Sequence, residues 1–250
     1  MQFGKLLCGE PIDDMREMKQ IMDNLRSKLD ILCDKILVHN WNTNENAAEV
    51  LFYGRNILET SLTALLGRTD PFRLITVYKI QSSDNYNIGK KMQSAVEFTG
   101  DIIASEKAKN LWDFTKKKEA FDRALLGNYL GEIIWKPGVN ALTDYIENKN
   151  ITSEWITEVL SIDERANFER WKSESSRLFS SFSKGVHSES LVDMGIVFDS
   201  ITIKDLVKDL YKLCATLGLI SHFIGYLVPN LSVDEALELF CETEETINEL

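Results

Sequence analysis

Two opposite charges, Arg55 and Glu59, lie within the apolar pattern of TNENAAEVLFYGRNILETSLTALLG, residues 43–67. A helix over this segment places both charges among its apolar side chains, because residues advance by about 100° around a helix. Burying a charge is unfavourable unless it is paired and hydrogen-bonded. The pattern therefore indicates either an ion pair within a helical bundle or a polar pocket whose guanidinium faces a substrate phosphate or RNA. The predicted apolar side comprises Leu51, Phe52, Leu58, Leu62, Leu65 and Leu66.

His187 is the third candidate site residue. It follows the aromatic segment SSRLFSSFSKGV and is close to Gly185, which lets a partner backbone approach. An imidazole there could serve as an acid, a base or a phosphate contact, and the alternative is a cap on helix carbonyls. His222 lies in an uncharged apolar run and is expected to be a hydrogen-bonded core histidine. His39, in HNWN, is interpreted as a loop or cap residue.

Two further groups of cations have both a functional and a structural interpretation. Arg68 and Arg73 could extend a positive rim near the end of the 43–67 helix, although surface solvation is the more ordinary explanation. A basic run with interleaved aromatic residues could bind a nucleic-acid backbone while bases stack on the rings. Its acidic neighbours instead favour a solvated helix face. The run comprises Lys107, Lys109, Trp112, Phe114, Lys116, Lys117 and Lys118.

No familiar catalytic or cofactor motif is present. The sequence lacks GxxxxGK[ST], GxGxxG, GxSxG, HExxH and CxxC, which argues against a nucleotide hydrolase and predicts neither a cofactor nor a metal. The four cysteines are far apart, so we expect a reduced, cytoplasmic protein. The net charge of −11 disfavours non-specific binding to nucleic acid or anionic membrane. The uncharged stretch 213–233 is interrupted by Pro229, so a buried helix is expected there and no membrane span.

Hydrophobic periodicity predicts an all-α helical bundle, forming a single domain over residues 1–250. A narrow seam over about 12–37 predicts a helix that packs peripherally, along another helix of the chain or in a dimer. The clearest pattern, 202–228, predicts a central helix whose Gly218 and Gly225 let another helix backbone approach closely. Residues 70–81 are β-rich at their end.

The segments AEVLFYGRNILETSLTALL and FSSFSKGVHSE resemble two helices of the HEPN-like all-helical proteins. The first matches a helix with arginine, three residues and glutamate, and the second a helix end that bears histidine. The resemblance implies a HEPN-like core and a place in bacterial toxin–antitoxin, abortive-infection or antiphage systems. Active HEPN ribonucleases carry arginine, four to six residues and histidine at a dimer interface and cut RNA without metal. This chain departs from that hallmark, since Arg177 precedes His187 by ten positions.

Two functions follow as hypotheses. The first is a non-catalytic interaction or regulatory subunit that binds another protein or a second copy of itself, with Arg55, Glu59 and His187 as a structural or ligand-sensing cluster. The second is a metal-independent ribonuclease, in which His187 is the acid or base, Arg55 stabilises phosphate charge and Glu59 orients one of them. The net charge alone raises a third, an acidic mimic of nucleic acid, against which the interspersed lysines argue.

Overall fold

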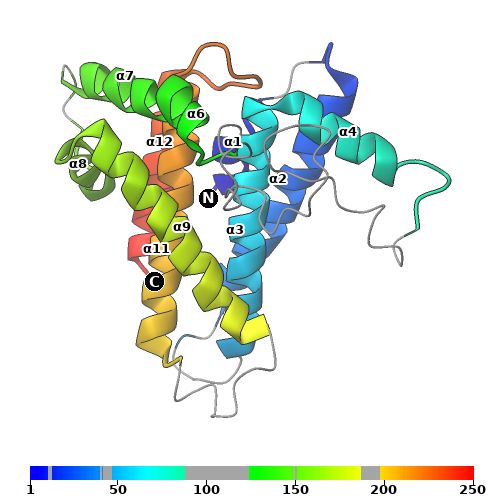
Figure 1. Cartoon of the computed structure of the whole chain (residues 1–250). Coiled ribbons are helices and arrows are strands. Elements are labelled where there is room, and N and C mark those ends of the chain that lie inside the picture. Colours follow the sequence, from blue (N-terminus) through cyan, green and yellow to red (C-terminus); the bar gives the residue numbers. More distant parts are fainter. Residues whose placement is uncertain are drawn as a thin grey trace.

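The computed structural model describes residues 1–10, 13–39, 41, 47–87, 124–147, 149, 151–186 and 198–250. Within these ranges the chain is helical and has no strand, which confirms the predicted all-α class for this part (Figure 1). The helices are α1 (Phe3–Cys8), α2 (Arg16–Leu37), α3 (Ala47–Thr69), α4 (Pro71–Gln81), α6 (Asn128–Leu130), the π-helical turn η2 (Gly131–Trp135), α7 (Lys136–Ile146), α8 (Glu154–Leu160), α9 (Glu164–Val186), α11 (Ser200–His222) and α12 (Val233–Asn248).

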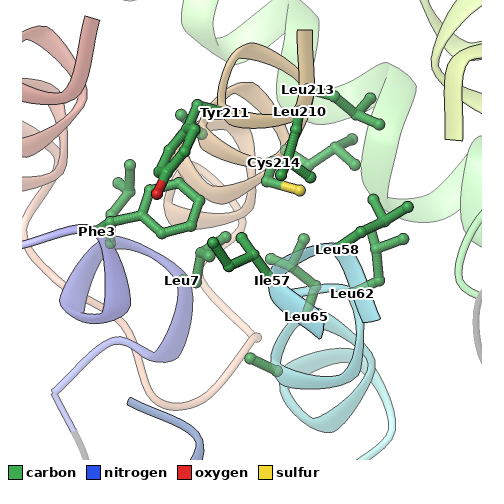
Figure 2. Close-up of a cluster of buried hydrophobic side chains, with 14 of the residues drawn as sticks. Phe3, Leu7, Ile57, Leu58, Leu62, Leu65, Leu210, Tyr211, Leu213 and Cys214 are labelled. Carbon is green, nitrogen blue, oxygen red and sulfur yellow. The ribbon is translucent and has the colours of Figure 1, made fainter. Parts of the chain in front are cut away.

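The short helix α1 lies at the centre of the core, where it contacts α2, α3, α11 and α12. Its Phe3, Leu6 and Leu7 side chains are fully buried. Figure 2 shows Phe3 beside Tyr211 of α11, and Leu7 between α11 and Ile57 of α3. Removing this apolar surface from water favours the packed arrangement, by roughly 1.5–3 kcal/mol for each large side chain. The core is therefore built around a helix too short for its periodicity to predict.

The apolar seam predicted for α2 packs against other helices of the same chain. Met18, Met22, Leu29 and Ile36 are buried on one side of it, and α2 packs against α1, α3 and α4. The helix–helix pairing expected from the seam is thus satisfied by intramolecular neighbours.

Helix α3 crosses α9, and glycines allow the two helices to approach closely (Figure 1). A Cβ atom added to Gly54 of α3 would lie 2.5 Å from the ring of Phe182 on α9. A Cβ atom added to Gly185 of α9 would lie 2.4 Å from Leu51 of α3. Both distances are shorter than side-chain packing permits, so this crossing requires glycine at both positions.

The structure differs from the sequence pattern at three places around α3 and α4. Residues 71–81 form a helix, because Pro71 suits the first helical turn and the side chains pack on α2 and α3. Gly67 does not end α3; it lies inside the helix where Leu74 and Met22 approach, and the helix continues to Thr69. Phe52 is 48% exposed instead of joining the apolar side.

The predicted central helix is present but shorter than expected. Helix α11 ends at His222, and its N-cap is Asp199, whose side chain accepts from the backbone N–H of Thr202 at 2.7 Å. The close approach predicted at Gly218 is confirmed, since a Cβ there would lie 3.5 Å from the Leu6 carbonyl oxygen. Gly225 is beyond the helix, and a Cβ added to it would meet no atom within 4 Å, so the prediction is wrong there.

Gly54→Ala is expected to lower the free energy of unfolding by about 1–2 kcal/mol, because displacing the buried Phe182 ring outweighs the gain in helix propensity. Urea denaturation would measure this change. Gly225→Ala is the matched control and should alter stability by less than about 0.5 kcal/mol, since its added methyl meets open space. Equal effects of the two substitutions would contradict the close α3–α9 contact.

Candidate functional site

Arg55 and Glu59 form an ion pair on the side of α3 that faces α9. Arg55 Nε lies 3.1 Å from Glu59 Oε1, and the two side chains are 21% and 37% exposed. The pair is therefore half-buried at the edge of the core. A spacing of four residues on one helix brings such side chains together, and partly exposed pairs of this kind contribute about 0.3–1 kcal/mol to stability.

Arg55 also connects α3 to α9. Its Nη1 donates to Ser183 Oγ at 2.9 Å, and its guanidinium carbon lies 4.6 Å from the centre of the Phe179 ring. Ser183 Oγ in turn donates to the Phe179 carbonyl at 2.6 Å. The guanidinium thus has a carboxylate, a hydroxyl and an aromatic face as partners within the protein, an arrangement that anchors it in one orientation.

Only part of the predicted site can be placed. Arg55 and Glu59 are together, and Arg55 reaches Ser183, which precedes His187 by four residues. His187 itself and the basic run 107–118 lie outside the described residues. The assignment of Arg55, Glu59 and His187 to one site remains a prediction.

The sequence interpretation places Arg68 and Arg73 at the surface, and both placements are wrong. Arg68 is 2% exposed, not part of a surface rim, and its guanidinium lies in the core. Nη1 donates to Ser221 Oγ at 2.5 Å and to the Leu7 carbonyl at 3.4 Å, and Nη2 donates to Asn230 Oδ1 at 2.5 Å. Arg73 is buried as well, paired with Asp70 at 3.1 Å. The spacing from Ser61 and Leu65 to Arg68 follows the buried face of α3, a signal that could have revealed the position.

His222 is confirmed as a hydrogen-bonded core histidine, and its contacts define its tautomer. Nδ1 lies 3.1 Å from the backbone nitrogen of Leu231 and 3.1 Å from Arg68 Nη2, so it accepts from donors. Nε2 lies 2.7 Å from the Leu6 carbonyl oxygen, so it carries the proton. Burial, and then the charge of Arg68, lowers the pKa of His222 to about 3. The imidazole is therefore neutral at physiological pH.

Helix ends compensate the charge of Arg68. Helices α1, α3 and α11 end at Cys8, Thr69 and His222, and all three ends lie near the guanidinium. The C-terminal end of a helix carries a partial negative charge, so three such ends favour a cation where no carboxylate of the described residues pairs with it. Burial lowers the pKa of Arg68 to about 9, which leaves it protonated near neutral pH.

The other reactive groups are placed for packing. Burial raises the pKa of the Cys8, Cys33 and Cys214 thiols to about 12, so these side chains are protonated and unsuited to nucleophilic attack. Among the described residues, no group of three or more histidine, cysteine or acidic side chains could hold a metal ion. No helix in the same part of the chain has both the length and the apolar character needed to cross a membrane.

The chain matches no protein-family model, no curated protein and no solved structure.

Arg68→Met is expected to lower the free energy of unfolding by about 3 kcal/mol, because the Leu7 carbonyl and the Asn230 and Ser221 side chains lose their donor in the core. Denaturant unfolding would measure the loss. Arg165→Met, at an exposed position of α9, is the control and should change stability by less than about 0.5 kcal/mol. A loss below about 1 kcal/mol for Arg68→Met would contradict this account.

Neutral, buried His222 predicts an acid-sensitive fold. The imidazole of His222 becomes protonated near pH 6.5 in the unfolded chain but only near pH 3 in the folded chain. The free energy of unfolding therefore falls as pH falls between these values. In His222→Gln, the slope of this free energy between pH 5 and 6.5 should decrease by up to about 1.4 kcal/mol per pH unit. His39→Gln is the control for loss of a less buried imidazole and should change the slope less. Identical slopes in the parent protein and His222→Gln would show that His222 is not buried neutral.

Proposed function

We propose that this protein is a non-catalytic helical interaction or regulatory subunit of HEPN-like character, which acts in a bacterial antiphage-defence or toxin–antitoxin assembly. Its partner is another protein subunit or a second copy of the chain. The resemblance of the α3 and α9 segments to HEPN-like helices supports the setting. The interactions of Arg55 support the non-catalytic role.

The observation that carries this proposal is the use of Arg55 as a link between two helices. Glu59 pairs with its Nε, Ser183 accepts from its Nη1, and Phe179 lies against its guanidinium. An arginine that binds a scissile phosphate must exchange such partners for the substrate, and breaking these intramolecular interactions weakens substrate binding. Stable intramolecular partners fit a structural or sensing role better.

Arg177 supports the same conclusion. It is the arginine that most closely precedes His187 in the sequence, so it is the residue nearest to the HEPN hallmark. Its Nη2 lies 2.5 Å from both Glu174 and Asp209. Two carboxylates therefore already bind the guanidinium that the HEPN pattern would offer to phosphate.

A metal-independent ribonuclease is the second candidate, and one contact favours it. Arg55 binds Ser183, which precedes His187 by four residues in the sequence, and His187 itself lies outside the described residues. In this alternative His187 transfers the proton of the RNA 2′-hydroxyl, and Arg55 stabilises charge on the phosphate.

Incubation of the purified protein with labelled single-stranded and structured RNA, in the presence of EDTA, separates the two functions. We expect no cleavage above that of RNA incubated without protein. Cleavage by the parent protein that is lost in both Arg55→Ala and His187→Ala, and kept in Arg165→Ala, would overturn the non-catalytic proposal.

Co-expression tests the partner. The chain would be produced with the products of its neighbouring genes, and complexes would be separated by size-exclusion chromatography. We expect a stable complex of defined stoichiometry with one of these proteins or with a second copy. A monomer under all these conditions would contradict the interaction role.

A further inference from the structure

A charged cavity of about 360 Å³ lies between α8, α9 and α11, which are neighbours in Figure 1. No residue of α3 lines it, so it is separate from the Arg55 cluster. Its floor consists of Trp171, Leu213 and Thr216, each almost fully buried. A volume of this size suits a small molecule, and its walls carry three cations and three carboxylates.

One end of the cavity has an excess of positive charge. Glu158 is bound by Arg170 at 2.5 Å and also by Lys212. Burial alone would raise the pKa of Glu158, but hydrogen bonds and charge from Lys212 and Arg170 hold it below the ordinary value. One carboxylate therefore faces two cations. Lys212 has three donors, of which one is used by a partner among the described residues.

The other end has an excess of negative charge. Arg177 is bound at 2.5 Å by both Glu174 and Asp209. Burial, and then the charge of Glu174, raises the pKa of Asp209 above its ordinary value despite Arg177. Asp209 accepts from Arg177 through Oδ2, so its second oxygen can accept from another donor. An additional cation at this end would relieve the repulsion between the two carboxylates.

The two ends lie at a separation that a short aliphatic chain can span. Arg170 and Glu174 are four residues apart on α9, or about 6 Å along the helix axis, and Asp209 and Lys212 are about 4.5 Å apart along α11. The lining also includes the indole of Trp171 and the side chain of Leu213, which suit methylene groups.

We infer that this cavity binds a small zwitterion, with a carboxylate at Lys212 and Arg170 and a primary ammonium at Asp209 and Glu174, joined by a short aliphatic segment over Trp171. The charge arrangement selects against molecules that carry only one of the two groups, because each leaves one end unpaired. This inference is independent of the proposed function, since it uses none of the interactions of Arg55. Binding of such a zwitterion would allow the protein to act as a sensor of this ligand.

Isothermal titration calorimetry with 6-aminohexanoate, hexanoate and hexylammonium tests the inference on the unmodified full chain. We expect saturable binding of one 6-aminohexanoate, and binding at least about tenfold weaker for hexanoate and hexylammonium. Absence of saturable heat with 6-aminohexanoate would overturn the inference. Equal affinity for hexanoate or hexylammonium would also overturn it, because one end would then suffice.

Variants of the two ends give a crossed test that a general loss of folding cannot imitate. Asp209→Asn should weaken 6-aminohexanoate about tenfold and leave hexanoate unchanged, whereas Lys212→Met should weaken both. Asp205→Asn and Lys208→Met, on the same helix outside the cavity lining, are the matched controls and should bind like the parent protein. Circular dichroism would verify that each variant is folded. Unchanged binding in Asp209→Asn and Lys212→Met would contradict the assignment.

Discussion

The guanidinium of Arg68 constrains how the helices of this protein can be arranged. It hydrogen-bonds to the carbonyl of Leu7 in α1, to Ser221 in α11 and to Asn230 in the segment before α12. Apolar side chains tolerate small shifts, but a buried cation does not tolerate the loss of its acceptors. Arg68 therefore fixes the relative positions of α1, α3 and α11 more specifically than the surrounding leucines can.

The position of α3 also determines where α9 lies. Its Gly54 allows α9 to cross closely, and one residue further Arg55 reaches Ser183 on that helix. Helix α9 then brings Arg170, Glu174 and Arg177 against α8 and α11, where they form the charged cavity. The polar cluster at Arg55 and the cavity are thus two products of the same helix placement, and a change in the α3–α9 crossing would affect both.

Much of the fold could be predicted because long amphipathic helices repeat their apolar residues over many turns. The seam of α2 and the run in α11 are examples. The six residues of α1 are too few to show a period, although they fill the centre of the core. Residues 71–81 contain several β-branched side chains, which are enriched in strands. The segment is nevertheless a helix, because its side chains pack on α2 and α3.

The polar sites are harder to predict than the helices. Arg55 and Glu59 can be identified because two charges interrupt an apolar pattern and lie one turn apart. The place of Arg68 on the buried face of α3 is a local signal, but its partners are not predictable, because they come from α1 and α11, more than 60 residues away in either direction. The cavity escapes prediction for the same reason, since its ion pairs join α9 to residues on two other helices.

A double-mutant cycle between Arg68→Met and Asn230→Ala tests most directly whether the buried guanidinium organises the bundle. The free energies of unfolding of the parent protein, both single variants and the double variant would be measured in urea. We predict a coupling of about 1–3 kcal/mol, because each residue loses its partner when the other is replaced. Effects that add to within about 0.3 kcal/mol would show that the two side chains act independently and would contradict the central role of Arg68.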